Sequence, residues 1–233
     1  MGNSSFLGGF SFVYLVKDIS LEDETTTSSS SYHDHPTSGE YLVLKITSIH
    51  SRHQRDIAEK EAKLLSRLSH PSIIRMFDSC YRSVPLHLND EILNTQSSKS
   101  KTKPHSFPPQ HLILMEYCDG GTALSVCNTM KQQNRRFDLH SLIIAFGQIC
   151  NAVSYLHAQR IPIVHRDLKP VNFLVKNGTY KLCDFGSAIF GHVDLRTSRA
   201  RAEAEEVIQK TTTQMFRSPE MVDLYMAKKL TQR

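Results

Sequence analysis

One dipeptide, Asn177-Gly178, constrains the fold of this chain more than any other feature of its sequence. It stands between two short runs of strand-forming residues, Phe-Leu-Val-Lys at 173–176 and Thr-Tyr-Lys-Leu-Cys at 179–183. Asn-Gly between such runs is the strongest short-range hairpin signal, because both central residues of a type I′ turn need positive φ. The sequence therefore predicts a hairpin, and pairing outward from its turn brings Asn172 next to Asp184.

The side chains of Asn172 and Asp184 both carry oxygen, and Asp167 and Lys169 lie just upstream. Oxygen donors suit Mg²⁺, which usually takes one or two protein ligands and completes its coordination with substrate phosphates and water. We therefore predict that Asn172 and Asp184 are metal ligands. The alternative is an Asx turn at Asn172 and a surface position for Asp184.

The rest of the chain divides into a strand-rich first part and a helical second part. Two stretches of mainly polar residues interrupt the first part and are expected to be loop insertions. The helix predicted last is apolar nearly all round, so we expect it to be buried. The predicted strands are 12–16, 41–46, 73–77 and 112–117, the predicted helices are about 52–68 and 140–157, and the insertions are 23–39 and 83–109.

Composition excludes several classes of protein. The 233 residues are 39% hydrophobic and carry a net charge of +5, so the chain is not wholly disordered. No uninterrupted apolar run approaches the ~18 residues of a membrane span, and no secretory signal is visible. Five scattered cysteines indicate neither a disulfide framework nor a zinc site. Because the positive charge is not clustered with aromatic residues, we expect no nucleic-acid partner. A cytoplasmic protein is expected.

The first predicted helix carries a carboxylate, Glu61, at a position expected to be buried. Glu61 falls on the face that would turn inward, and a buried carboxylate needs a cation. Lys45, in the middle of a predicted strand, is the obvious candidate, although Glu61 could instead reach solvent at the edge of that face. The apolar residues that share this face are Ala58, Ala62, Leu65 and Leu68.

Four motifs occur in the order of the protein-kinase signature set. They are Val-Leu-Lys at 43–45, His-Arg-Asp-Leu-Lys-Pro-Val-Asn at 165–172, Asp-Phe-Gly at 184–186 and Ser-Pro-Glu at 218–220. The chain thus resembles the catalytic domain of eukaryotic Ser/Thr protein kinases. Gly8 to Ser11, Leu182 to Ala188 and Thr212-Thr213 are most similar to the Numb-associated kinase group, which includes the cyclin-G-associated and AP-2-associated kinases.

The resemblance implies an α+β, bilobal protein-kinase-like fold with a β-rich N-lobe and an incomplete helical C-lobe. One partial kinase domain would cover residues 1–233, with an N-lobe over 1–117 and a partial C-lobe over 118–233. The later helices of the family would follow the Ser-Pro-Glu motif and are absent. We therefore expect this chain by itself to be unstable or inactive.

The resemblance also implies roles for individual residues, with ATP and Mg²⁺ as cofactors and a protein phosphorylated on Ser or Thr as substrate. Asp167 would accept or orient the proton of the acceptor hydroxyl, and His165 would pack against Phe185 as a structural residue. The implied catalytic residues are Asp167, Lys169, Lys45 and Glu61. The implied ATP-binding residues are Gly8, Gly9, Ser11, Val13, Val43, Lys45, Met115, Glu116, Cys118 and Leu174.

Two further hypotheses concern function and partners. The chain could be a kinase-like ATP-binding or regulatory module without catalysis, which is the alternative to a phosphotransferase. By analogy with the subgroup, clathrin adaptors are a possible partner class. Membrane association rests only on acylation at Gly2, and Phe6 stands where the acylation pattern has Ser or Thr.

Overall fold

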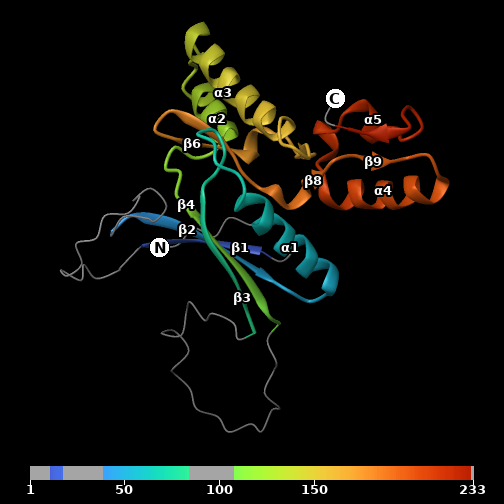
Figure 1. The fold of residues 1–233 in the computed structure, drawn as a ribbon. Helices are drawn as coiled ribbons and strands as arrows, with labels where there is room; N and C mark the ends of the chain where they lie inside the picture. The colour runs from blue at the N-terminus through green and yellow to red at the C-terminus, as the bar shows by residue number, and fades with distance from the viewer. Residues whose placement is uncertain (1–10, 18–38, 84–107, 232–233) are drawn as a thin grey trace, which may run out of the picture. The chain divides into compact units, whose positions relative to one another are not determined.

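The computed structural model describes residues 11–17, 39–83 and 108–231 (Figure 1). The predicted ATP-binding residues Gly8 and Gly9, the acylation site and most of both insertions lie outside the described residues. The elements in chain order are β1 (Ser11–Lys17), β2 (Tyr41–Ser48), α1 (Arg52–Leu65), β3 (Met76–Arg82), β4 (Gln110–Glu116), α2 (Ala123–Gln132), α3 (Leu139–His157), β5 (Ile163–Val164), η1 (Pro170–Asn172), β6 (Phe173–Lys176), β7 (Thr179–Leu182), η2 (Phe185–Ser187), β8 (Ile189–Phe190), β9 (Val193–Asp194), α4 (Ser198–Thr211), η3 (Gln214–Phe216), α5 (Pro219–Val222) and β10 (Lys229–Leu230).

The chain forms two compact units, which we describe separately. The first contains the residues up to Ala62 together with 76–116, and the second contains 63–75 together with 117–233. In the first unit, β1, β2, β4 and β3 form an antiparallel sheet in that order, and α1 belongs to the same unit as far as Ala62. The mixed α+β architecture and the N-terminal antiparallel sheet are those expected of a kinase fold.

The strand predicted at 73–77 is confirmed only in its last two residues. β3 begins at Met76, so Met76 and Phe77 lie in the sheet, but the predicted start is wrong. Ile73 and Ile74 instead belong to the second unit, where Ile73 forms a β-bridge with Leu182 and the amide of Ile74 donates to the Leu182 carbonyl at 2.9 Å. Both isoleucines are buried there, so their apolar character reflects packing on the hairpin rather than membership of the sheet.

The hairpin predicted from Asn177-Gly178 is confirmed. β6 and β7 pair from Phe173 opposite Leu182 to Lys176 opposite Thr179, and both turn residues have positive φ, 50° and 75°. The ladder continues one step outward, since the amide of Cys183 donates to the carbonyl of Asn172 at 2.9 Å. The turn chemistry therefore fixes the register that places Asn172 and Asp184 at the same end of the hairpin.

The helix expected to be buried, α3, is instead largely exposed within the described residues. Only Ala152 and Leu156 of α3 are buried. By length and a mean hydropathy of 1.4, α3 is the one helix of the described chain that could cross a membrane. The sequence predicts no span because no uninterrupted apolar run approaches ~18 residues, and the longest run lies in α3 at 142–146. Since core helices of globular proteins meet the same criterion, α3 alone does not indicate a membrane protein. The apolar side chains exposed on it are Leu139, Leu142, Ile143, Ile144 and Phe146.

The segment from β9 to β10 forms a small cluster of its own around α4, which no sequence pattern predicted (Figure 1). β9 and β10 pair antiparallel, and α4 lies beside β9. Ala204 and Ile208, one turn apart on α4, turn inward. The buried side chains of this α4 cluster are Leu195, Ala204, Ile208, Leu224 and Leu230, with Val193 and Met221 packed against them.

Candidate active site

Lys45 and Glu61 form the ion pair that the helix pattern predicted. Lys45 Nζ donates to both carboxylate oxygens of Glu61, at 2.7 and 2.8 Å. The two side chains are only 14% and 6% exposed, so water screens this pair much less than a surface pair. The alternative, in which Glu61 reaches solvent, is excluded.

One face of the sheet gathers several of the predicted nucleotide-binding residues. Val13 is directly opposite Lys45, and Val43 is directly opposite Met115. Residues opposite one another in antiparallel strands share a face, as do residues two apart along a strand. Val13, Val43, Lys45 and Met115 therefore line one face of the first unit.

The other predicted nucleotide-binding residues occupy separate positions. Ser11 begins β1 and its hydroxyl hydrogen-bonds to that of Thr47 at 2.9 Å. Glu116, at the end of β4, is buried in the first unit. Cys118 is buried in the second unit, and Leu174 lies in β6 and forms a β-bridge with Thr122. The roles of these residues remain predictions.

The carboxylate of Asp167, in the second unit, is held by three other residues. Its Oδ1 accepts from the backbone amide of Thr213 at 2.9 Å. Its Oδ2 contacts Lys169 Nζ at 2.6 Å and accepts from Asn172 Nδ2 at 3.2 Å. Burial alone would raise the pKa of Asp167, but the hydrogen bonds from Lys169 and Thr213 outweigh it and lower that pKa. Asp167 is thus an ionised carboxylate in a fixed orientation.

His165, two residues before Asp167, contacts backbone groups on both sides of the site. Its Nε2 donates to the carbonyl of Cys183 at 3.1 Å, because a carbonyl oxygen can only accept, and its Nδ1 faces the amide of Asp167 at 3.4 Å. Burial lowers the pKa of His165, which agrees with this neutral tautomer. The ring meets Phe185 edge to face at 5.0 Å between centroids. The predicted packing of His165 on Phe185 is confirmed.

Asn172 and Asp184 have the chemistry that the predicted metal site needs. Asn172 is 1% exposed, and its Nδ2 donates to the carbonyl of Asp167 at 2.8 Å as well as to Oδ2. Its side-chain oxygen is therefore the group it can offer to a cation. Asp184, at the same end of the hairpin, adds a carboxylate. Oxygen ligands of this kind fit Mg²⁺, but which residues bind it remains a prediction.

Sequence reasoning named Thr213 and Ser187 only as parts of motifs and did not predict the contacts that they and Arg217 make around the site. Lys169 Nζ donates to Thr213 Oγ1 at 2.7 Å, so Thr213 contacts both Lys169 and Asp167. The hydroxyl of Ser187 donates to the carbonyl of Thr211. Arg217 donates to Thr212. A cation that closely follows the C-terminus of a helix can bind the last carbonyls of that helix, which would have indicated a role for Arg217. This signal was not used because α4 was not predicted from the sequence.

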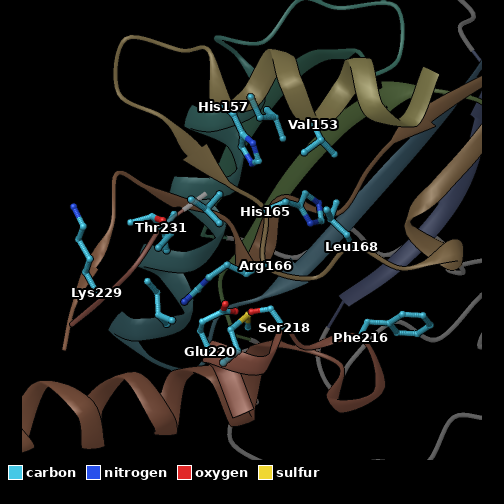
Figure 2. Close-up of a pocket in the computed structure, with 15 residues that line it drawn as sticks. Val153, His157, His165, Arg166, Leu168, Phe216, Ser218, Glu220, Lys229 and Thr231 are labelled. Atoms are coloured by element: carbon cyan, nitrogen blue, oxygen red, sulfur yellow. The ribbon is translucent and has the colours of Figure 1, made fainter. Parts of the chain in front are cut away.

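The second unit contains a cavity of about 240 Å³, which is separate from the predicted site residues Asp167, Asn172 and Asp184 (Figure 2). Val153 and His157 of α3 line one side of it, and Ser218 and Glu220 line the other. Its lining includes His165, Arg166 and Leu168 but none of Asp167, Asn172 and Asp184. We therefore do not assign it to the nucleotide.

Comparison with known proteins identifies the family. A family model described as the protein kinase domain matches residues 27–232. The chain belongs to the protein kinase domain family. Two probable serine/threonine-protein kinases of Dictyostelium discoideum are similar to this kinase domain, one 32% identical over 221 residues and one 31% identical over 220 residues. Each alignment covers 94% of this chain, so the homology to serine/threonine kinases extends over nearly all of it.

A third relative is Actin-regulating kinase 1 of Saccharomyces cerevisiae, 37% identical over 130 residues and 55% of this chain. The kinase domain described here spans 16%, 23% and 20% of the lengths of these three relatives. Members of the family are transferases that use ATP and Mg²⁺ and act on proteins. The same cofactors and substrate class are therefore expected for this kinase domain.

Proposed function

We propose that this chain catalyses transfer of the γ-phosphoryl group of ATP to Ser or Thr hydroxyls of a protein. The observation that carries the proposal is the fixed, ionised Asp167, held by Lys169, Thr213 and Asn172. In phosphoryl transfer the protein contributes mainly positioning and charge stabilisation. The acceptor oxygen bonds to the γ-phosphorus, the bond from that phosphorus to the bridging oxygen breaks, and Asp167 takes the hydroxyl proton.

The remaining residues would serve the nucleotide. Asn172 and Asp184 would hold Mg²⁺, which when bound neutralises charge on the phosphates. Lys45, oriented by Glu61, would bind the α- and β-phosphates, and Lys169 would contact the γ-phosphate. The residues proposed to bind the rest of ATP are Gly8, Gly9, Ser11, Val13, Val43, Met115, Glu116, Cys118 and Leu174.

Finer proposals concern classification. We propose the bilobal kinase arrangement, with residues 1–117 as N-lobe and 118–233 as a partial C-lobe. The likeness to Actin-regulating kinase 1 supports placing the chain in the Numb-associated kinase group, which would make clathrin adaptors the first substrates to try. The five free cysteines support a cytoplasmic location.

Trace labelling tests the activity. Purified chain is incubated with γ-labelled ATP, Mg²⁺ and a generic Ser/Thr acceptor protein. In contrast to the inactivity expected from the sequence alone, the proposal predicts label in the wild type, and a fall of about 10²-fold or more in Asp167→Asn because the general base is lost. Asp184→Ala should fall similarly, since it removes a proposed metal ligand. The matched control is Asp56→Asn, which removes an exposed carboxylate of α1 and should keep the wild-type rate.

Nucleotide binding separates the two hypotheses. Equal labelling in the wild type, Asp167→Asn and Asp184→Ala would contradict the proposed transfer. If ATP·Mg²⁺ still raised the melting temperature in that case, the chain would be the binding module instead. Phosphoamino-acid analysis of the acceptor checks the Ser/Thr assignment, and label on tyrosine alone would overturn it.

A further inference from the structure

The C-terminal end of α4 is held by the guanidinium of Arg217. Arg217 Nε donates to Thr212 Oγ1 at 2.9 Å, and Nη2 faces the carbonyls of Ile208 at 3.3 Å and Thr212 at 3.2 Å. The carbonyl of Ile208 also accepts from the amide of Thr212 at 3.1 Å and from its hydroxyl at 2.6 Å, so Arg217 adds a charged donor at a helix end, where a cation is favoured. Arg217 therefore fastens the last turn of α4 to the residues that follow it.

The residues fastened in this way lead directly to Asp167. Thr213, the next residue after Thr212, gives its amide to Asp167 Oδ1 at 2.9 Å and accepts from Lys169 Nζ at 2.7 Å. Just before it, the carbonyl of Thr211 accepts from Ser187. The chain from 211 to 213 thus carries any displacement of the end of α4 to the proposed general base.

The helix that Arg217 contacts, α4, is itself held in the α4 cluster by further contacts. Near the other end of α4, Arg201 Nη1 donates to the carbonyl of Leu195 at 2.6 Å, and its guanidinium lies 4.6 Å from the ring centroid of Tyr225. The buried side chains of the cluster hold the middle of the helix. Contacts at both ends and buried side chains in the middle thus connect α4 to the rest of 193–230.

We propose that Arg217 is a positioning residue, which holds Thr213 against Asp167 and Lys169 by coupling them to the α4 cluster. Its role in phosphoryl transfer rests on the proposed function, whereas its effect on Thr213 does not. The fork of the guanidinium matters, since two of its nitrogens reach three acceptors. A lysine ammonium is a single point of charge on a flexible stem and does not reproduce that geometry.

Hydrogen exchange of the Thr213 amide reports the proposed contact without any need for activity. On phosphatase-treated protein, we expect Arg217→Gln to exchange this amide at least tenfold faster than the wild type, and Arg217→Lys to lie between them. The control is Arg199→Gln, an exposed arginine of the same helix that pairs with Glu203 at 2.8 Å. It removes the same charge and should leave the exchange rate of Thr213 unchanged.

Kinetics add a readout that a purely structural role would not move. We expect kcat to fall by about 10- to 100-fold in Arg217→Gln while the KM for ATP stays constant, since misplacement by ~1 Å costs up to ~10²-fold. Wild-type exchange at Thr213 in Arg217→Gln, or equal acceleration in Arg199→Gln, would overturn the proposal. If Arg217→Gln does not fold, wild-type exchange in Arg217→Lys overturns it. A wild type without activity, but with faster exchange in Arg217→Gln, supports the coupling and refutes the proposed function.

Discussion

At the scale of single residues, the predicted catalytic region holds two non-glycine residues in left-handed backbone. Arg166 has φ 68° and Asp184 has φ 61°, and each lies next to a residue with a proposed role or has one itself. Such conformations cost roughly 1–2 kcal/mol for an L-residue. Arg166 is kept there in part by the bond from its Nε to the carbonyl of Ser187, at 2.6 Å. The strain points to a site whose geometry is held by its surroundings.

The pair of Lys45 and Glu61 allows a prediction of stability. Lys45→Met leaves the Glu61 carboxylate, 6% exposed, without its cation. Removing one partner of a buried pair costs several kcal/mol, so we expect the free energy of unfolding to fall by about 2–4 kcal/mol. Urea denaturation followed by circular dichroism measures this change.

The double variant Lys45→Met/Glu61→Leu distinguishes the cause of that loss. If the uncompensated charge of Glu61 is responsible, the second substitution restores much of the stability, because a buried pair replaced by apolar side chains is often tolerated. Equal destabilisation of the single and the double variant would show instead that Lys45 matters through its packing.

At the scale of elements, a close approach of two backbones fixes the segment that precedes α2. The amide of Gly120 donates to the carbonyl of Val175 at 2.9 Å, and a Cβ at Gly120 would lie 2.8 Å from Val175 Cβ. We expect Gly120→Ala to lower the free energy of unfolding by about 1–3 kcal/mol, as overpacking does. Thermal and urea denaturation give the value.

Gly147 serves as the matched control, with the opposite sign. It lies inside α3, and no atom of the residues described by the structure is within 4 Å of the Cβ that alanine would add. Alanine lowers the entropy of the unfolded chain and suits a helix, so we expect Gly147→Ala to stabilise by about 0.5–1 kcal/mol. Destabilisation by both variants would mean that the close approach at Gly120 is not the cause.

The elements also show why the sequence predicts some parts and not others. The hairpin was predictable because its turn depends only on local chemistry at 177–178. The position of 73–74 was not, because an apolar run does not say which unit buries it. α4 was missed because most of its residues are polar and its buried face rests on Ala204 and Ile208 alone. Thr213 and Asp167 are 46 residues apart in the sequence, so no local pattern could predict the contact between them.

At the scale of the whole molecule, two buried histidines and two half-buried ones make stability depend on pH. Burial lowers the pKa of all four below the ordinary value: His70, His111, His157 and His165. The unfolded chain therefore binds more protons than the folded chain as the pH falls through ~6.5, and stability rises with pH. We expect urea midpoints to be highest above pH 7 and to fall steadily towards pH 5.

His111 on β4 allows that dependence to be assigned. It is 5% exposed, and its buried Nδ1 has no hydrogen-bond partner among the described residues, so protonation would place a charge there at a cost that leucine avoids. Nearby, Glu59 favours the charged form of His111 and Lys45 opposes it, but burial dominates the lowered pKa. His111→Leu should thus lose less stability between pH 7.5 and pH 5.5 than the wild type, whereas the exposed control His140→Gln should follow the wild type. A wild-type slope in His111→Leu would assign the acid sensitivity to the histidines of the second unit.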